Sequence, residues 1–402
     1  MRHPRQAART QKPPPRSPAR SALITGVSLI AGVLAFLVVS RLVGGVPSST
    51  PAEAAGTPVA KPAASDRKAS TSRSRTPAAG EQLRAKAPLN KVSQDQGSSI
   101  ALPDGRTLWI FADTFQKDRS PSFFVTSSVA TTEPGGRVLS YATHGGVPTE
   151  FLPRTKREHK GSRDGVRYTA VWPVGSTLLP DGRVIIAYAK YNVTVRSQQY
   201  EFLGSGLFAY RYRSAKALHK GAVATRIADD MWAAYDGEVR SPVYADGFVY
   251  FSQCQDLKCY SLRTTPQGLT DRLTYRWWTG SGWSAKRSDR APVTIGSAHP
   301  GGNASVVRLS TGGYAMADTE VGAPSPYGYL WVAPRAWGPW SRAASFVMPN
   351  CGSRGCYGLN LHPTQSTGTL LRLSYSTVIG PYVRVTDIPV TMAADRTSVS
   401  VR

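Results

Sequence analysis

Asp95 and Asp113 are two residues whose types and spacing could do chemistry. They lie in the stretch from Gln94 to Phe115, QDQGSSIALPDGRTLWIFADTF, where Asp104-Gly105 joins two strand-like runs. An Asp-Gly pair between alternating apolar runs predicts a hairpin with a type I′ turn, whose two central residues both have φ above zero. Folded about this turn, the two aspartates lie opposite one another or one step out of register.

A close pair of carboxylates is expected to divide its protonation. Like charges placed opposite each other destabilise a plain sheet, so a purely structural hairpin should avoid them. When two carboxylates share a site, the pKa of one rises, so that one acid stays protonated while the other is ionised. The alternative interpretation is a surface hairpin in which water solvates both aspartates.

Five copies of one local pattern indicate the fold that positions this pair. Each copy is a turn containing glycine followed by an apolar and aromatic strand. Because such long repeats of strand sequence are typical of propeller blades, we expect an all-β, five-bladed β-propeller over residues 92–402. A β-sandwich is the alternative, but it gives no reason for a fivefold recurrence. The turn glycines are Gly105, Gly182, Gly247, Gly312 and Gly368.

The ends of the repeated second strands carry different polar residues. The first copy ends at Asp113, the second at Lys190 and the fourth at Asp318. In a propeller such equivalent positions lie near one face, so the variation predicts a site on that face. Solvated strand ends would produce a similar pattern.

The residues before the propeller predict a membrane anchor. The chain has 402 residues and a net charge of +24, and residues 1–21 form a basic tail. The run from Ala22 to Ser40 is uncharged and long enough to cross a bilayer core of about 30 Å. Residues 22–43 are therefore predicted to be a single-pass transmembrane helix, with the N-terminus cytoplasmic and the propeller extracytoplasmic. A cleaved signal peptide ending near Ala52-Glu53-Ala54 is the alternative.

Residues 44–91 are predicted to be a disordered linker. They are dominated by Ala, Pro, Ser, Thr, Lys and Arg, which cannot bury enough apolar surface to offset the entropy of ordering. Their basic side chains could lie along acidic wall polymers or lipid headgroups, or the segment could be a plain spacer. The basic charge is spread along the chain without a groove-binding motif, which argues against a nucleic-acid partner.

The four cysteines form two short pairs, Cys254 with Cys259 and Cys351 with Cys356. Each pair encloses four residues and can close a small disulfide loop, as expected outside the cytoplasm. A zinc site made from both pairs is the rival, but it would need the pairs to meet in a reducing compartment. No metal and no cofactor are expected, because the chain has no P-loop, dinucleotide fingerprint or H-E-x-x-H motif.

The opening motif resembles the start of the five-bladed endo-D-arabinanases of glycoside hydrolase family 183. The similarity is carried by Asp95-x-Gly97-Ser98, Pro103-Asp104-Gly105-Arg106-Thr107-Leu108-Trp109, Phe111-x-Asp113-Thr114-Phe115, Ser128-Val129-Ala130, Trp172-Pro173, Ser241-Pro242-Val243 and Tyr357-x-x-x-x-His362-Pro363. Members of this family cleave internal D-arabinofuranosyl bonds of arabinogalactan and lipoarabinomannan. The resemblance implies that Asp95 and Asp113 are the two catalytic aspartates. Ala112 and Ser127 depart from the family pattern, which leaves a different specificity or binding without cleavage open.

The implied chemistry needs one carboxylic acid to protonate the leaving oxygen and one carboxylate to act as nucleophile or to activate water. The sequence does not give the separation of the two carboxyl groups, so inversion and retention both stay open. Glu238, in YDGEVRSP, is a third catalytic candidate and could be the acid. Alternatively, it is a structural residue paired with Arg240 or another arginine.

Sugar binding would need aromatic faces and polar groups that bond hydroxyls. The candidates for substrate binding are Trp172, Lys190, Asn303, Asp318, Tyr357 and His362, with Tyr188 and Tyr327 as further aromatic positions. Each aromatic residue could equally pack in the core.

The sequence as a whole predicts a membrane-anchored, extracytoplasmic hydrolase that acts on cell-wall arabinan. The rival hypothesis keeps the propeller and the anchor but assigns a non-catalytic role in binding wall glycan. The oligomeric state is left open.

Overall fold

The computed structural model describes residues 83–401 with gaps. Outside the described residues lie 1–82, 87–88, 90–91, 117–122, 164–165, 198, 256–257, 294–304, 311, 320–323, 352–354, 364–365, 367–369, 378–379, 393–398 and 402, and of 380–401 only the backbone is described. The predicted tail and transmembrane helix, nearly all of the linker, Asn303 and Gly368 therefore lie outside the described residues. No helix among those described is long and apolar enough to span a membrane.

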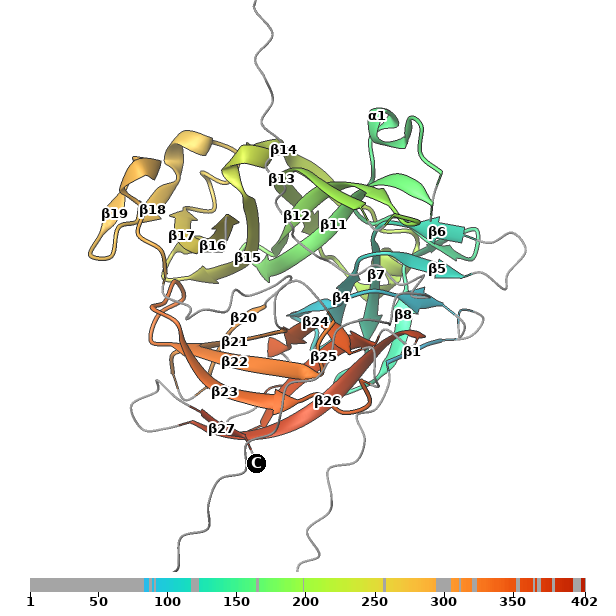
Figure 1. The fold of residues 1–402 in the computed structure, drawn as a ribbon. Coiled ribbons are helices and arrows are strands. Elements are labelled where there is room, and N and C mark those ends of the chain that lie inside the picture. Colours follow the sequence, from blue (N-terminus) through green and yellow to red (C-terminus); the bar gives the residue numbers. More distant parts are fainter. Residues whose placement is uncertain are drawn as a thin grey trace, which may run out of the picture.

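Five sheets of four or five strands make up most of the described chain (Figure 1). We call them blades 1 to 5 in chain order. Blade 1 holds β3 (Ser98–Ala101), β4 (Thr107–Phe111), β7 (Ser128–Thr132), β8 (Val138–Tyr141) and, at its edge, β1 (Arg84–Ala85). Blade 2 holds β11 (Arg167–Leu178), β12 (Arg183–Thr194), β13 (Gln199–Arg211) and β14 (Thr225–Ala233).

The remaining three blades continue in the same way. Blade 3 holds β15 (Glu238–Ala245), β16 (Phe248–Gln255), β17 (Lys258–Thr264), β18 (Arg276–Trp278) and β19 (Trp283–Ser284). Blade 4 holds β20 (Val306–Arg308), β21 (Tyr314–Thr319), β22 (Tyr327–Ala333) and β23 (Ser341–Val347). Blade 5 holds β24 (Cys356–Leu361), β25 (Leu370–Thr377), β26 (Gly380–Met392) and β27 (Val399–Val401).

Short elements connect the blades. A small sheet contains β2 (Ser93–Gln94), β5 (Thr114–Gln116) and β6 (Phe123–Val125), and a two-stranded ribbon contains β9 (Thr143–His144) and β10 (Val147–Pro148). The α-helices of the described residues are α1 (Lys156–His159) and α2 (Ala215–His219). The 3₁₀ turns are η1 (Ala234–Asp236), η2 (Arg272–Thr274) and η3 (Arg287–Asp289). The described chain is thus nearly all β, as predicted.

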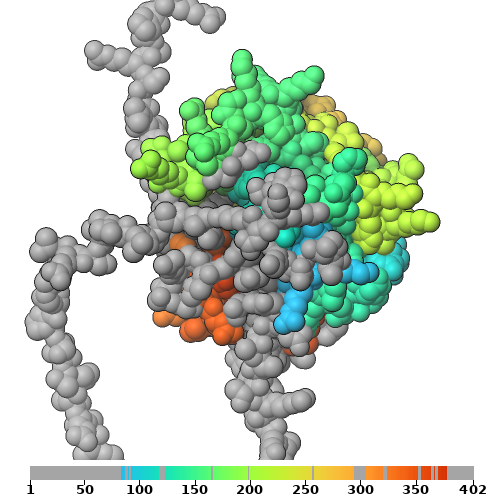
Figure 2. Space-filling model, turned by 90° about the vertical axis from the view of Figure 1, so that its right-hand side faces the viewer, coloured from blue at the N-terminus to red at the C-terminus, as the bar shows by residue number. Residues whose placement is uncertain are grey.

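The first strands of blades 1 to 4 lie next to one another on the inside of a ring, and the first strand of blade 5 continues the ring beside the second strand of blade 4. The strand β11 contacts both β3 and β15, β15 contacts β20, and β24 contacts β21. Large buried clusters fill the spaces between consecutive blades; in one of them Ile185 of blade 2 joins Val239 of blade 3. Turned by 90°, the molecule shows the blue and teal surface of blade 1 between the green surface of blade 2 and the orange surface of the C-terminal blades (Figure 2). This arrangement is a β-propeller.

The repeated turn of the sequence is the hairpin between the first and second strand of a blade. Gly105, Gly182, Gly247 and Gly312 lie in these hairpins of blades 1 to 4, and all four have positive φ. The predicted type I′ turn at Asp104-Gly105 is wrong. Gly105 N–H donates to Leu102 O at 3.0 Å and Asp104 keeps a negative φ, so the loop is a type I turn with a glycine bulge. The reason is Pro103, whose ring holds φ negative at the first central position.

Side chains close the ring between blade 1 and blade 5. His362 is fully buried, and its Nδ1 and Nε2 lie 2.6 Å from the hydroxyls of Ser99 and Ser374. Its ring lies 4.6 Å from the ring of Trp109. The backbone N–H of Gln96 donates to Ser376 Oγ at 2.9 Å. Hydrogen bonds therefore join blades whose sequences lie more than 260 residues apart.

Both predicted disulfides are confirmed. Cys254 and Cys259 lie opposite each other on β16 and β17 and are bonded, and Cys351 is bonded to Cys356 at the start of β24. None of the four thiols is free, so the alternative of a zinc site made from the cysteines is wrong. Each bridge holds the chain at the same end of its blade, where the first strand begins.

The buried imidazole of His362 predicts acid sensitivity. Burial lowers its pKa to about 3, whereas in the unfolded chain it is about 6.5. The unfolded state therefore binds the proton first, and stability is lost as the pH falls below about 6.5. We expect this group alone to cost about 2 kcal/mol of unfolding free energy between pH 7 and pH 5.

Denaturant unfolding at both pH values measures this cost. His362→Gln should unfold more easily at pH 7 but lose less stability on acidification than the natural chain. His144→Gln, which changes an exposed histidine, is the control and should leave the pH dependence intact. An unchanged pH dependence in His362→Gln would contradict the buried neutral state.

Candidate functional site

Asp95 and Asp113 face each other across two paired segments, in the predicted register. Gln94 is paired with Thr114 on one side of them and Ser98 with Ile110 on the other. The backbone N–H of Asp95 donates to Asp113 O at 2.9 Å. The two carboxylates therefore share one site, and the alternative of two solvated aspartates does not hold, because Asp113 is only 6% exposed.

A local break in the pairing sets this site apart from the sheets on either side. Gln96 has φ +48°, a left-handed conformation that is uncommon for residues other than glycine. Opposite it, Ala112 N–H donates to Asp95 O at 3.0 Å in place of the regular ladder bond. A Cβ on Gly97 would lie 3.0 Å from the Phe111 ring, so glycine suits this close approach. The chain passes here from the small sheet into blade 1.

Neighbouring blades donate hydrogen bonds to both carboxylates. From β11 of blade 2, the Tyr168 hydroxyl donates to Asp113 Oδ2 at 2.5 Å and Trp172 Nε1 donates to Asp113 Oδ1 at 2.7 Å. From β24 of blade 5, the Tyr357 hydroxyl donates to Asp95 Oδ1 at 2.7 Å. Blades 2 and 5 therefore orient a pair that blade 1 carries.

The two acids differ in their affinity for a proton. Burial raises the pKa of Asp113 to about 8, helped by the negative charge of Asp95 and opposed by the bonds from Tyr168 and Trp172. Burial raises the pKa of Asp95 to about 6, and the bond from Tyr357 opposes this. Near neutral pH the pair therefore holds one proton, mainly on Asp113. This division is what acid–base chemistry on a substrate requires.

Glu238 is a third carboxylate on the same face. It is the first residue of β15 and only 5% exposed. The Tyr191 hydroxyl donates to Glu238 Oε2 at 2.7 Å, and Arg240 lies 3.4 Å from the same oxygen. The predicted pairing with Arg240 is therefore present. Trp172 connects this carboxylate to the pair, because its ring packs 5.4 Å from that of Tyr191.

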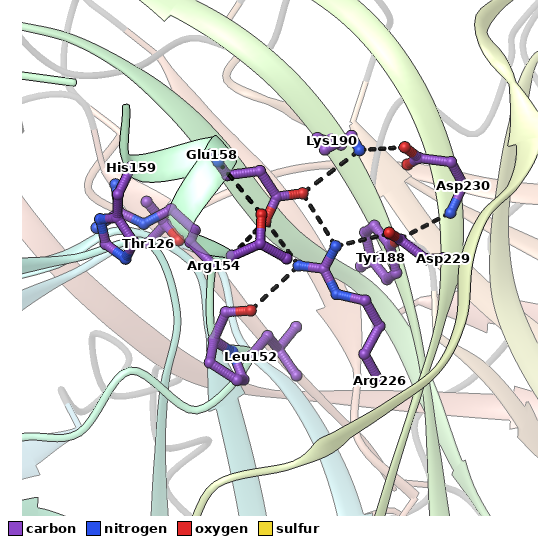
Figure 3. Close-up of polar contacts among 12 residues, drawn as sticks. Thr126, Leu152, Arg154, Glu158, His159, Tyr188, Lys190, Arg226, Asp229 and Asp230 are labelled. Carbon is purple, nitrogen blue, oxygen red and sulfur yellow. Dashed lines mark hydrogen bonds and ion pairs between the residues drawn. The ribbon is translucent and has the colours of Figure 1, made fainter. Parts of the chain in front are cut away.

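Lys190 lies in a network of ion pairs, which Figure 3 draws. Its Nζ is paired with Asp230 and lies 3.4 Å from Glu158 Oε1, and Arg226 binds the other Glu158 oxygen at 2.8 Å. Although burial favours the neutral acid, bonds from Arg226 and the Thr155 backbone and the nearby positive charges lower the pKa of Glu158 to about 2. The network attaches the segment containing α1 to blade 2, and sugar binding by Lys190 stays a prediction.

The other predicted binding residues lie at different depths. Trp172 and Tyr357 are buried and donate to the aspartates, and His362 lies inside the ring closure. Asp318 is 1% exposed and accepts from Thr319 N–H at 2.7 Å. Of the two further aromatic positions, Tyr188 is buried and bonded to Asp229, whereas Tyr327 is 49% exposed. Their binding of sugar stays a prediction.

Tyr168 and Tyr191 were missed by the sequence reasoning. Tyr168 lies four residues before Trp172 on β11, and residues at even spacing on a strand point to the same side. That spacing of two donor-bearing rings was a usable signal for Tyr168. Tyr191 directly follows Lys190, where the pairing of β12 with β13 shifts register. No local pattern marks such a shift.

No family model and no curated protein matches the chain, but solved structures do. A protein from Bacteroides ovatus that is described as a "putative hydrolase" is similar at 14% identity, over 73% of this chain and 85% of that one, with a TM-score of 0.51. The GH43_1 enzyme from Xanthomonas citri complexed with xylotriose is similar at 11% identity, over 77% and 90%, with a TM-score of 0.47. The exo-β-1,3-galactanase from Phanerochaete chrysosporium with galactose is similar at 11% identity, over 81% of this chain and 67% of that one, with a TM-score of 0.45. At 14% identity the likeness concerns the fold alone, and the chemistry of this chain must be argued from its own residues.

Proposed function

We propose that this protein is a glycoside hydrolase whose catalytic residues are Asp95 and Asp113. The observation that carries the proposal is a pair of opposed aspartates with pKa values of about 6 and about 8. They are oriented by donors from two other blades on one face of a propeller. Glycoside hydrolysis needs one protonated and one ionised carboxyl group at the scissile bond.

In the proposed mechanism Asp113 is the acid and Asp95 the carboxylate. Asp113 gives its proton to the leaving glycosidic oxygen as the bond to the anomeric carbon breaks. Asp95 supplies negative charge to the oxocarbenium-like transition state. Tyr168 and Trp172 stabilise Asp113 once it is ionised, since both donate to its oxygens. The oxygen of a water molecule then bonds to the anomeric carbon, and the proton that this water loses replaces the one that Asp113 gave to the leaving group.

The proposed substrate is an internal D-arabinofuranosyl linkage of a cell-wall arabinan, and the proposed location is the outer side of a membrane. The support is the resemblance of the opening motif to endo-D-arabinanases, the apolar run at residues 22–43 and the two disulfides. The disulfides favour an oxidising compartment.

Incubation of the full-length chain in detergent with arabinogalactan tests the activity, with chromatography of the products. Internal cleavage should release oligosaccharides of mixed length before any single sugar accumulates. A folded protein that binds arabinogalactan and releases nothing would favour the rival hypothesis of a non-catalytic wall-binding propeller. A folded protein that neither binds nor cleaves it would exclude arabinan as the ligand.

We expect Asp95→Asn and Asp113→Asn to fold and to lose turnover. In Asp113→Asn the amide oxygen can still accept from Trp172, and the amide nitrogen can donate to the Tyr168 hydroxyl. Because both aspartates have raised pKa values in the folded state, their ionisation costs stability as the pH rises. At pH 8 the free energy of unfolding of Asp113→Asn should therefore equal that of the natural chain or exceed it by about 1–3 kcal/mol.

Product assays and denaturant unfolding of these variants give both readouts. Asp104→Asn, at the opposite end of the same hairpin, is the matched control and should keep full activity. Asn variants that unfold readily but cleave arabinan at the natural rate would overturn the catalytic assignment.

The pH profile of kcat/KM should be bell-shaped. Activity should rise as Asp95 ionises near pH 6 and fall as Asp113 loses its proton near pH 8. In Tyr168→Phe the alkaline limb should move to higher pH, because a donor that favours ionised Asp113 is lost. Tyr212→Phe, which loses a bond to Asp104, is the control and should leave both limbs in place. An alkaline limb that stays or moves down in Tyr168→Phe would contradict Asp113 as the acid.

A further inference from the structure

The connection from blade 2 to blade 3 presents an exposed aromatic residue and ends at a carboxylate of the site face. It comprises residues 233–238 and contains η1. Tyr235, in the middle of η1, is 73% exposed, whereas the next residue, Asp236, is completely buried. The connection ends at Glu238, which Tyr191 and Trp172 link to Asp113. The exposed ring is therefore only three residues away from a carboxylate of the site face.

Buried charges hold this connection in one position. Asp236 Oδ1 is paired with Arg272 at 2.9 Å and with Arg287, while Asp236 Oδ2 accepts from Ala233 N–H at 3.1 Å. Arg287 also donates to Asp236 O at 2.8 Å. Burying a carboxylate costs several kcal/mol and is tolerated only with such complete pairing, so a displaced connection would lose all of these bonds at once.

Gly237 adds a steric reason for the fixed position. Its φ is +87°, and a Cβ built on it would lie 2.6 Å from Cys254 O. The backbone therefore lies directly against the strand that carries the Cys254–Cys259 disulfide. Tyr235 thus extends from a backbone held in one position, and most of its side chain is exposed. Aromatic residues at a fixed, exposed position supply large contact area at low entropic cost.

Glu238, three residues after Tyr235, offers a hydrogen-bond acceptor that has no donor. Its Oε1 is buried and has no hydrogen-bond partner among the described residues, while Tyr191 and Arg240 both contact the other oxygen. A buried carboxylate oxygen without a donor is costly. A ligand hydroxyl would remove that cost. The two groups together match a sugar, which has an apolar face and hydroxyl donors.

We propose that Tyr235 and Glu238 form a glycan-binding subsite at the edge of the Asp95–Asp113 pair, where Tyr235 stacks on a sugar ring and Glu238 Oε1 accepts a bond from a sugar hydroxyl. The proposal rests on the proposed glycosidase function and assigns Glu238 to binding, with bond cleavage left to the aspartates. A subsite outside the cleavage point suits an enzyme that binds the middle of a polymer, because sugar units on both sides of the scissile bond then contribute to binding.

Steady-state kinetics of the full-length chain on arabinogalactan test the subsite. Tyr235→Ala should raise KM by about tenfold while kcat keeps its order of magnitude, and Tyr235→Phe should restore the natural KM. Leu273→Ala is the matched control: this side chain is 85% exposed on the neighbouring η2, whose Arg272 binds Asp236. It should leave KM unchanged, because it removes apolar surface without removing an aromatic face.

Glu238→Gln separates binding from chemistry. If Glu238 accepts a bond from a sugar hydroxyl, the substitution should mainly raise KM. If Glu238 were the proton donor, the substitution would lower kcat by about 100-fold or more. Thermal melting of each variant confirms that the fold is retained. A natural KM in Tyr235→Ala, or a collapsed kcat in Glu238→Gln, overturns the subsite.

Failure of the subsite is distinguishable from failure of the proposed function. If the natural chain does not cleave arabinogalactan, binding of the polymer to Asp113→Asn and to the Asp113→Asn/Tyr235→Ala double variant decides the matter. Weaker binding by the double variant supports the subsite on its own. Equal binding, or no binding by either, overturns it.

Discussion

The contact between blade 1 and blade 5 is the constraint on which the rest of the structure depends. In the part of the chain that the structure describes, no strand from the N-terminal end joins the sheet of blade 5 and no strand from the C-terminal end joins that of blade 1. Side chains close the ring instead. The imidazole of His362 is hydrogen-bonded to Ser99 and Ser374. The Ser376 hydroxyl accepts from the backbone N–H of Gln96. Because these groups are buried, each must find its partner across the contact or lose a hydrogen bond without compensation. The requirement holds the two blades in one relative position.

The carboxylate pair lies at this same contact and draws its properties from it. Asp95 directly precedes the left-handed Gln96, and its donor Tyr357 belongs to blade 5. Packing of the blades buries Asp113 and partly encloses Asp95, which raises both pKa values at a cost in stability. Such a cost is expected where a site needs a protonated acid at neutral pH. The buried hydrogen bonds and clusters between blades offset it.

Sequence patterns with short range predicted much of the fold and part of the site. The recurring turn identified the hairpin that begins each blade, and the hairpin placed Asp95 opposite Asp113. The turn type failed at one position because Pro103 outweighed the Asp-Gly signal. The partners of the pair could not be predicted in the same way, since Tyr168 and Tyr357 reach the aspartates from other blades. Nor did any local pattern reveal that Lys190 is surrounded by acids of its own blade and of the preceding connection.

The hydrogen bond from Tyr357 to Asp95 spans 262 positions of the sequence. A ribosome makes the N-terminal end first, so a nascent chain carries both aspartates long before the tyrosine exists. Asp113 can gain its donors Tyr168 and Trp172 as soon as blade 2 has been made, whereas Asp95 must wait for Tyr357. The bond to Asp95 forms only when blade 5 docks on blade 1. A polypeptide that ends before blade 5 therefore lacks this bond even though it contains both acids.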